Sequence, residues 1–455
     1  MERERLGSRL GFILLSAGCA IGIGNVWKFP YIAGQYGGGI FVLIYAFFLV
    51  ILGIPVMTME FSLGRASQKS PARLYQELEP KNTKWHIHGY VSVIGNYLLM
   101  MFYTTVTGWM LQYFVATAKG DLAGLDTEGV KNYHNSVIAD YKMMIVFMAI
   151  VVILGFLVCS LGVANGLEKI TKVMMIALLG IMVVLAINSI FLDGGKEGLS
   201  FYLLPDIGKM KEVGIFNVIV AAMNQAFFTL SLGMGAMAIF GSYLGKDRAL
   251  MGESINVAIL DTFVAFVSGL IIFPACFAYD VPVDSGPNLI FVTLPNVFNN
   301  MPLGRLWGSL FFVFMSFAAL STIFAVFEGI IACTCDLFGW SRKKACAING
   351  VLMFVLSLPC ILGFNVLSSF KPFGKDSNIM GLEDFIVSNL LLPIGSFVYV
   401  LFCVSKKGWG WENFVKEANT GKGVKIANWM RGYFTYVLPI IIFLLFAFGL
   451  YNFFA

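Results

Sequence analysis

The chain has 455 residues, of which 58% are hydrophobic and only 13% are charged, and its mean hydropathy is +0.81. A soluble domain carries about 25% charged residues, so this chain cannot cover its surface with polar groups and must lie in lipid. The composition excludes a cytosolic enzyme, a secreted module and a disordered scaffold. The net charge of +5 comes from scattered basic residues without an arginine-rich stripe, which argues against a nucleic-acid partner.

The cysteines and histidines give no sign of a resident metal or of redox chemistry. The eight cysteines lie almost entirely in apolar runs and form no CxxC pair, so we expect neither a disulfide framework nor a zinc site. The three histidines lie in loop-like or flanking sequence, which argues against a histidine proton relay in the membrane. The first apolar run lacks a small-residue cleavage site, so we expect no cleavable signal peptide.

Apolar runs long enough to cross a bilayer predict eleven transmembrane helices, because a helix needs about 20 apolar residues to span the hydrocarbon core. An α-helical bundle is expected, since other backbone would leave peptide groups unsatisfied in lipid. The predicted spans are 9–35, 39–64, 89–118, 142–160, 165–192, 213–243, 252–278, 304–337, 345–364, 384–404 and 429–454.

The distribution of lysine and arginine predicts the orientation of these spans. With the N-terminus inside, the inner segments carry 21 basic residues and the outer segments carry nine. This bias follows the positive-inside rule and predicts a multi-pass protein of the inner (plasma) membrane. An odd number of spans places the C-terminus outside. The segment 279–303 is too short and interrupted to span, and we interpret it as an external re-entrant element or lid.

Two spans are interrupted by glycines at mid-depth. The first carries Gly18, Gly22 and Gly24, and the sixth carries Gly233 and Gly235. Each glycine costs about 1 kcal/mol relative to alanine in a helix interior. Close helix packing through small residues is one explanation. Because the two spans lie five apart and both hold polar groups, we favour broken helices that expose backbone groups at a transport site, one in each of two five-helix repeats.

Asp261, in the seventh span, is the most informative of the intramembrane charges, which are costly in lipid and point to function. It needs a cation or a proton. With Asn25, Thr229 and freed carbonyls available, a hard monovalent cation with oxygen ligands is the natural partner. The alternative is a protonated aspartate that bonds to a neighbouring helix.

Four further charges lie within spans. We interpret Glu60 and Glu328 as structural, and expect Glu60 to bind backbone amides freed by a broken helix. Lys28 and Asp384 lie near the outer ends of their spans and could pair across an external vestibule, although two independent snorkelling charges are the alternative.

Adjacent hydroxyls, Ser321 and Thr322, follow two small residues in the eighth span. Neighbouring side chains lie about 100° apart on a helix, so one hydroxyl could bind an ion while the other lines a substrate cavity. A hydroxyl that bonds back to its own helix is the commoner arrangement.

Several long motifs resemble the neurotransmitter:sodium symporter family, in its bacterial amino-acid branch with eleven spans. They are RLGFILLSAGCAIGIGNVWKFPYIAGQYGGGIF in the first span, GIPVMTMEFSLGR in the second, QAFFTLSLGMGA in the sixth, FVTLPNVF in the outer loop and LST in the eighth. The resemblance implies an all-α fold with a five-plus-five inverted repeat. The first repeat would comprise 1–192 and the second 213–404, including the loop 279–303, while 405–455 would hold a cytoplasmic loop and the eleventh span.

The resemblance also implies sodium-coupled uptake of an L-amino acid with two sodium ions. One sodium site would use Ala20, Asn25, Thr229 and Asp261, and the second would use Gly18, Ile21, Ala318, Ser321 and Thr322. The substrate site would comprise Ala20, Gly22, Gly24, Leu99, Tyr103, Phe228, Thr229, Ser231, Met234, Thr322 and Val326. Tyr103 and Phe228 would close the outer pathway, Lys28 with Asp384 would form the outer gate, and Arg3 with Asp336 would form the inner gate, near Tyr243 and Glu328.

Three departures from the family pattern refine these expectations. Lys28 replaces the usual arginine and loses its two-pronged hydrogen bonding. Asp261 replaces the usual asparagine, beside the place near Tyr45 and Ala265 where chloride assists animal members, so we expect transport without chloride. Gly22 stands where amine transporters carry aspartate, which disfavours monoamines.

The pocket is apolar and contains Met234, a flexible side chain that can repack around large groups. We therefore expect a neutral hydrophobic or aromatic L-amino acid as the substrate. A non-transporting amino-acid sensor on the same fold and a proton-coupled variant, in which Asp261 titrates, are the alternatives. A membrane enzyme is not expected, because the sequence shows no nucleophile–base pair or metal cluster near the interface. The sequence leaves the oligomeric state open.

Overall fold

The computed structural model describes residues 6–279, 288–375 and 377–454. Within these residues the chain is helical, and the only β contacts are two isolated bridges, Gly38 with Pro205 and Arg248 with Lys422. The prediction of an all-α polytopic fold is confirmed.

The described residues 6–213 form eleven α-helices and three π-helical turns. In chain order these are α1 (Arg9–Ala20), η1 (Gly24–Lys28), α2 (Phe29–Gln35), α3 (Gly39–Phe48), η2 (Leu49–Gly53), α4 (Ile54–Ser67), α5 (Pro71–Leu78), α6 (His86–Lys119), α7 (Thr127–Ala139), α8 (Tyr141–Ser160), η3 (Val163–Glu168), α9 (Lys169–Ile190), α10 (Gly195–Leu203) and α11 (Ile207–Val213).

The described part of the second half forms eleven more α-helices and three π-helical turns. These are α12 (Ile215–Thr229), α13 (Ala236–Ser242), α14 (Leu250–Ala278), η4 (Leu289–Thr293), α15 (Leu294–Asn300), α16 (Gly304–Phe338), α17 (Arg342–Leu362), α18 (Ile379–Phe385), η5 (Ile386–Leu391), α19 (Leu392–Val404), α20 (Trp411–Ala418), α21 (Met430–Gly432), η6 (Tyr433–Val437) and α22 (Leu438–Phe454).

Nine helical segments of the described chain are long and apolar enough to cross a membrane, and two bent pairs raise the number to as many as eleven. The unbroken segments match nine of the predicted spans. In the first bent pair α1 and η1–α2 meet at 54°, within the predicted first span. In the second, the short helix α11 meets α12 at 95°, and α12 and α13 together occupy the predicted sixth span.

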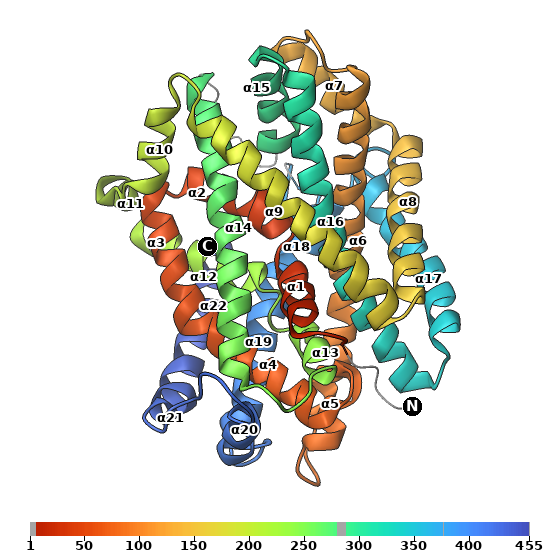
Figure 1. Ribbon diagram of the computed structural model, residues 1–455, viewed down its shortest axis with the longest axis vertical. Helices are drawn as coiled ribbons and strands as arrows, with labels where there is room; N and C mark the ends of the chain where they lie inside the picture. Colours follow the sequence, from red (N-terminus) through yellow and green to blue (C-terminus); the bar gives the residue numbers. More distant parts are fainter. Residues whose placement is uncertain (1–5, 280–287, 376, 455) are drawn as a thin grey trace.

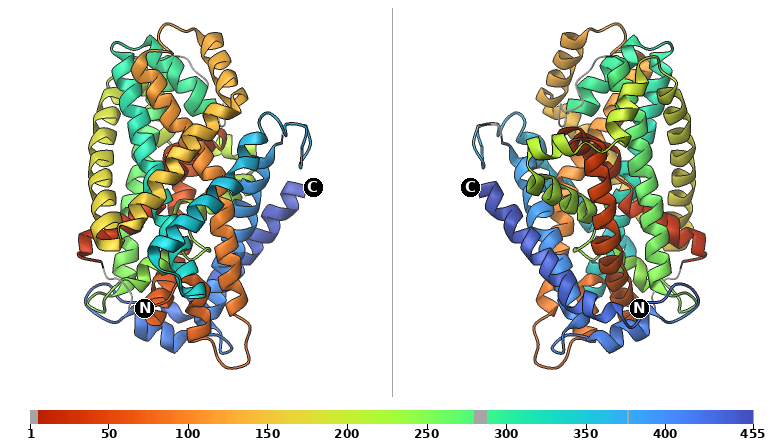
Figure 2. Two further views of the ribbon diagram at one scale, coloured as in Figure 1. Left: turned by 90° about the vertical axis from the view of Figure 1, so that its right-hand side faces the viewer. Right: turned by 90° about the vertical axis from the view of Figure 1, so that its left-hand side faces the viewer.

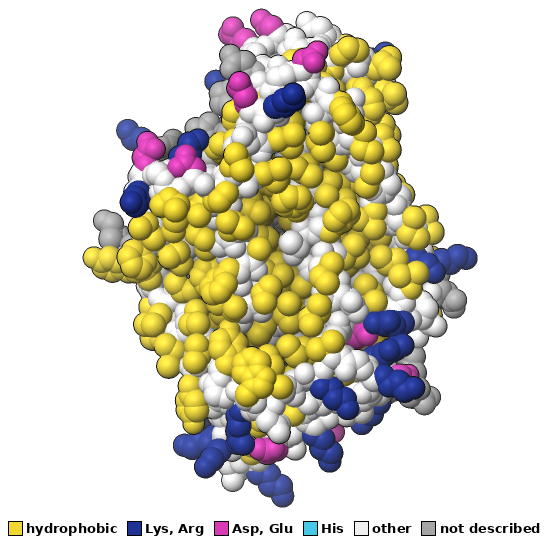
Figure 3. Space-filling model, turned by 60° about the vertical axis from the view of Figure 1, so that its left-hand side comes forward, with side chains coloured by type: hydrophobic (Ala, Val, Ile, Leu, Met, Phe, Trp, Pro, Cys, Tyr) yellow, Lys and Arg dark blue, Asp and Glu magenta, His cyan; other side chains and the backbone are white. Residues whose placement is uncertain are grey.

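The long helices run roughly along the long axis of the molecule (Figure 1). The helices α7 and α15 lie at one end, called the lid end below. The helices α5 and α20 lie at the opposite end, called the basic end (Figures 1 and 2). A wide apolar belt separates the ends, and lysine and arginine side chains gather around the basic end (Figure 3).

The two interrupted spans lie in the centre of the bundle, where α1 packs against α14 and α16, and α13 packs against α4. One contact near this centre is between backbones. Gly233, in the interruption of the sixth span, has φ +96°, and a Cβ atom there would lie 2.2 Å from the Leu392 carbonyl oxygen. A Cβ atom on Gly395 would lie 1.9 Å from the Gly233 oxygen. Only glycine at both positions allows α19 to approach the interruption this closely.

Candidate functional site

The first interruption follows α1, which ends at Ala20 because Ile21 takes an extended conformation with ψ 96°. The chain becomes helical again only at Gly24. Carbonyl oxygens at the end of a helix have no amide partner four residues on, so they are free to accept other groups. Here the carbonyls of Gly18, Cys19 and Ile21 accept hydroxyl groups from α16.

The second interruption separates α12 from α13. Ser231 has φ +52°, Gly233 has φ +96° and Gly235 has φ +76°, so the chain turns through left-handed conformations that a helix cannot contain. The freed amide of Gly233 donates to the Glu60 carboxylate, with N to Oε1 2.6 Å. Glu60 therefore lies where the sequence predicted it, against backbone amides released by a broken helix.

Asp261 lies at the centre of a polar cluster built from three other helices. Asn25 Nδ2 lies 2.8 Å from its Oδ1, Thr229 Oγ1 lies 3.1 Å from its Oδ2, and Tyr45 OH lies 3.4 Å from the same oxygen. The three partners and Asp261 are at most 1% exposed. Each partner can donate a hydrogen bond to a carboxylate, so the cluster is suited to an ionised Asp261 that is shielded from water.

A second cluster of oxygens lies between α1 and α16. Ser321 Oγ donates to the Ala318 carbonyl at 2.9 Å and to the Ile21 carbonyl at 3.3 Å. Thr322 Oγ1 lies 3.2 Å from the Cys19 carbonyl and 3.3 Å from the Gly18 carbonyl. Back-bonding by Ser321 to its own helix occurs, as the sequence left open, but it is combined with contacts across to α1. Carbonyl and hydroxyl oxygens in this arrangement are suited to a hard cation.

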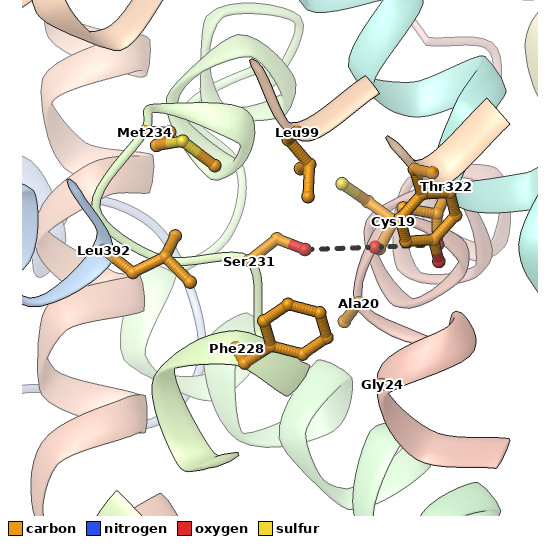
Figure 4. A pocket seen from close by; sticks show the side chains of 10 residues that line it. Cys19, Ala20, Gly24, Leu99, Phe228, Ser231, Met234, Thr322 and Leu392 are labelled. Atoms are coloured by element: carbon orange, nitrogen blue, oxygen red, sulfur yellow. Dashed lines mark hydrogen bonds between the residues drawn. The ribbon is translucent and has the colours of Figure 1, made fainter. Parts of the chain in front are cut away.

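Thr322 of the second cluster also lines a small apolar cavity with a volume of about 20 Å³ (Figure 4). Because this space admits about one water molecule, an amino acid requires the walls to move apart. Ser231 Oγ donates to the Cys19 carbonyl across the cavity at 3.3 Å. The lining residues are Cys19, Ala20, Gly24, Leu99, Tyr103, Phe228, Ser231, Met234, Thr322 and Leu392.

Eight of the predicted substrate residues line this cavity, and three do not. Thr229 instead belongs to the Asp261 cluster, Gly22 lies behind the Tyr103 hydroxyl, and Val326 is buried one helical turn beyond Thr322. Cys19 and Leu392 line the cavity and were not predicted. Cys19 lies next to the glycines of the first interruption, where the prediction concerned backbone groups and not side chains. Leu392 lies in an ordinary apolar run. The local sequence therefore gives no indication that either residue lines a cavity.

Tyr103 connects the cavity with the first interruption. The amide of Ile23 donates to the Tyr103 hydroxyl, with N to O 2.8 Å. A Cβ atom on Gly22 would lie 2.1 Å from that hydroxyl and 2.4 Å from Thr322 Oγ1. Glycine at this position therefore lets two hydroxyl groups reach the backbone of the broken helix.

A larger hollow of about 270 Å³ adjoins this cavity. Tyr103 and Phe228 line both spaces, so their rings stand between them. On the far side, Lys28 Nζ lies 3.0 Å from Asp384 Oδ1, 3.1 Å from Ser388 Oγ and 4.1 Å from the centre of the Phe228 ring. The sequence predicted the pair of Lys28 and Asp384, whereas Ser388 was missed.

The segment predicted as an external lid is described from residue 288 onward, as η4 and α15. Its Phe291 ring lies 6.0 Å from Trp27, 5.7 Å from Trp109 and 5.1 Å from Tyr113. The imidazole of His134, on α7, stacks on Phe291 at 5.7 Å and lies 2.9 Å from the Tyr113 hydroxyl. Burial in this aromatic cluster lowers the pKa of His134 to about 4.

Near the basic end, Glu328 accepts from Tyr243 OH at 2.6 Å and pairs with Arg342. Asp336 accepts from the backbone amide of Ser70 at 2.7 Å. Arg3, the predicted partner of Asp336, lies outside the described residues. The contacts of Glu328 fit its interpretation as a structural charge.

Comparisons with known proteins decide the family. A model of the sodium:neurotransmitter symporter family matches residues 3–136 and 127–455. The chain belongs to this family. An uncharacterized sodium-dependent transporter of Bacillus subtilis, YhdH, is 36% identical over 87% of this symporter and 86% of its own length. One from Methanocaldococcus jannaschii, MJ1319, is 30% identical over 97% and 89%.

A solved structure and a more distant relative agree with this assignment. The crystal structure of MhsT in complex with L-phenylalanine superimposes on this symporter with a TM-score of 0.89, 36% identity and coverage of 98% of this chain and 99% of that one. The human sodium- and chloride-dependent taurine transporter is 24% identical over 97% of this chain and 77% of its own. The protein is thus a sodium-dependent symporter of the membrane and not an enzyme.

Proposed function

We propose that this symporter imports a neutral hydrophobic or aromatic L-amino acid together with two sodium ions, by alternating access and without chloride. The observation that carries the proposal is that two separate oxygen clusters and one apolar cavity lie together at the broken helices: Thr322 of the second cluster lines the cavity, as do Gly24 and Phe228, the chain neighbours of Asn25 and Thr229 in the first. The binding of L-phenylalanine by MhsT supports the substrate class.

Each oxygen cluster fits one sodium ion by its donor set. The first would bind between Asn25, Thr229, Asp261 and the Ala20 carbonyl, and the substrate carboxylate would complete the shell. The second would bind between the carbonyls of Gly18, Ile21 and Ala318 and the hydroxyls of Ser321 and Thr322. A shared ligand makes the coupling reciprocal, so sodium raises the affinity for substrate and substrate raises that for sodium.

The cavity favours a hydrophobic side chain. Leu99, Phe228, Met234 and Leu392 supply apolar walls, and Met234 can repack because its side chain is unbranched and flexible. The substrate carboxylate would meet the Tyr103 hydroxyl and the amides of the first interruption, at the N-terminal side of η1. The ammonium would meet carbonyls such as those of Ala20 and Phe228.

Chloride independence follows from the fixed charge of Asp261. Its carboxyl group is fully buried next to Tyr45, and it would lie beside the place that a chloride ion occupies in the animal members that the sequence resembles. An added anion there would be repelled by a like charge at short distance.

The basic end would face the cytoplasm and the lid end the outside of the plasma membrane. Lys28 with Asp384 and the rings of Tyr103 and Phe228 would close the outer pathway, and Asp336 with Arg3 the inner one. We retain 1–192 and 213–404 as the two repeats, followed by 405–455. Two sodium ions and a zwitterion would carry two charges inward, which yields about 4.6 kcal/mol per 100 mV.

The deciding experiment is uptake of labelled amino acids into proteoliposomes, with sodium or potassium outside. We expect sodium-dependent accumulation above equilibrium for phenylalanine and leucine, unchanged when gluconate replaces chloride. Binding without accumulation would instead support an amino-acid sensor. Accumulation driven by a proton gradient alone would reassign Asp261 to proton transport, and a preference for glycine or a charged amino acid would contradict the pocket assignment.

A further inference from the structure

The short helix α18 carries two consecutive acidic residues that face different surroundings. Asp384 pairs with Lys28 beside the larger hollow, and its side chain is 38% exposed. Successive residues of a helix point about 100° apart. Glu383 is accordingly turned away from the hollow and is only 4% exposed, where α18 packs against α6 and α17.

The Glu383 carboxyl group has almost no polar partner there. Neither of its oxygens has a hydrogen-bond partner of ordinary geometry among the described residues. The polar side chain that faces it is the thiol of Cys360 on α17, which in turn faces Thr105 on α6. The segments 89–118 of α6, 345–362 of α17 and 386–391 of η5 contain no lysine, arginine or histidine, so these elements offer no cation to this carboxyl. The loop that contacts α18 through Phe373 carries Lys371 and Lys375, and neither forms an ion pair with Glu383.

Such surroundings suit a neutral carboxyl group and not a carboxylate. Burying an ionised carboxylate without a cation or several donors costs several kcal/mol, whereas a protonated carboxyl can be accommodated. Packing α18 against α6 and α17 in this closed arrangement therefore favours a bound proton.

We propose that Glu383 is a proton-binding site that links closure of the lid end to the pH outside. This inference rests on the proposed transport function, since it assigns a step of that cycle. When α18 separates from α6 and α17, water reaches the carboxyl and it can ionise; when the helices close again, the proton must return. Proton exchange takes place with the outer solution, because Asp384, on the same helical turn as Glu383, borders the larger hollow. No net proton transport is therefore expected.

The sign of the pH effect follows from linkage. The closed form binds the proton more tightly than the open form, so a lower outer pH favours closure. Uptake at limiting substrate should rise as the outer pH falls from about 8.5 to about 5.5, by as much as about tenfold per pH unit where closure limits the rate. The Glu383→Gln variant, which mimics the neutral carboxyl group, should lose this dependence on pH. At every outer pH its rate of uptake should equal the rate that wild type reaches at low outer pH.

The experiment measures sodium-driven uptake in proteoliposomes at fixed inner pH and varied outer pH, with a pH-sensitive dye inside. Wild type is compared with Glu383→Gln and with Glu412→Gln, a control that removes an exposed carboxylate paired with Arg431 at the basic end. We expect a sloped profile for wild type and for Glu412→Gln, a flat profile for Glu383→Gln, and no acidification of the lumen.

Two results would overturn the proposal. One is an identical slope for wild type and Glu383→Gln, which would make Glu383 a neutral packing residue. The other is a flat wild-type profile, which decides the question even if the variant does not fold. Sodium-driven accumulation by wild type in the same assay tests the transport function separately, so failure of this inference can be told from failure of that function.

Discussion

Gly22 shows how a single missing side chain shapes the site. Two hydroxyls, from Tyr103 and Thr322, occupy the space where its Cβ atom would lie. The Gly22→Ala variant should fold, because the added methyl group meets movable hydroxyls and not backbone. We expect it to lower substrate affinity by more than about tenfold, which corresponds to about 1.4 kcal/mol. Binding of labelled phenylalanine to purified protein measures this.

The matched control for Gly22 is Gly180→Ala on α9, where a Cβ atom would meet nothing within 4 Å. It should bind substrate as wild type does. If Gly22→Ala bound the substrate with the affinity of wild type, the present positions of the Tyr103 and Thr322 hydroxyls would not be required for substrate binding.

Asp261 contributes the only full charge within its cluster. Replacing it by asparagine preserves the size and some hydrogen bonds but removes the charge that would attract sodium in a site shielded from water. We expect Asp261→Asn to raise the sodium concentration needed for half-maximal uptake by at least about tenfold. Thr262→Val is the control, because the Thr262 hydroxyl bonds to Ala258 on its own helix. An unchanged sodium dependence in Asp261→Asn would remove Asp261 from the sodium site.

At the scale of elements, one ion pair joins η1 to α18 beside the larger hollow. Lys28 is 17% exposed and Asp384 38% exposed, so water weakens the attraction between them and the pair stabilises closure only modestly. Lys28→Arg keeps the charge and adds a planar fork, and should transport within about threefold of wild type. Lys28→Met leaves Asp384 without its cation, and should reduce the initial rate of uptake by about tenfold.

Lys209→Met is a matched control for this gate, since Lys209 also lies over a phenylalanine ring, Phe201, at 4.5 Å. Its uptake should equal that of wild type. Equal uptake by Lys28→Met would argue that the ion pair does not take part in closure.

The contact between α7 and η4 should depend on pH through His134. Its pKa is lowered to about 4 from 6.5, so the folded chain favours the neutral ring. The stabilising effect is complete above about pH 6.5 and is lost progressively as the pH falls toward 4, because the unfolded chain then binds the proton more readily. His134→Gln should lower the melting temperature in detergent at neutral pH, and the difference from wild type should shrink in acid.

The control for His134 is Asn135→Gln on the same helix, where the side chain is exposed. The melting temperature of this variant should equal that of wild type at every pH. A difference between His134→Gln and wild type that stays constant from neutral pH to about pH 4 would contradict the assignment.

At the scale of the whole molecule, the excess of basic residues at one end predicts its orientation. A protease site appended to the C-terminus should be cleaved in intact spheroplasts, and one appended to the N-terminus only after lysis. A site inserted into the loop 405–428 should behave like the N-terminal one. Cleavage of the C-terminal site only after lysis would reverse the prediction.

The sequence predicts most of the fold because the signals for it are local. Apolar length marks the spans, and the glycines at 22, 24, 233 and 235 mark the interruptions. The polar residues of both oxygen clusters were also found, since charges and hydroxyls are conspicuous in apolar helices. What escaped prediction depends on how helices rotate and pack. Leu392 and Glu383 have ordinary neighbours in the sequence. Only the packing of the helices brings Leu392 to the cavity and buries Glu383.

The backbone contact between Gly233 and α19 has a mechanical consequence. The interruption that carries Ser231 and Met234 touches the same continuous segment, 379–404, that holds Asp384. A shift of that segment must displace the peptide groups beside the cavity directly, with no side chain acting as an intermediary. Side-chain substitutions alone should therefore be unable to disconnect the two movements, and a designer who wished to separate substrate release from the opening of the lid end would have to alter the main chain at Gly233 or Gly395.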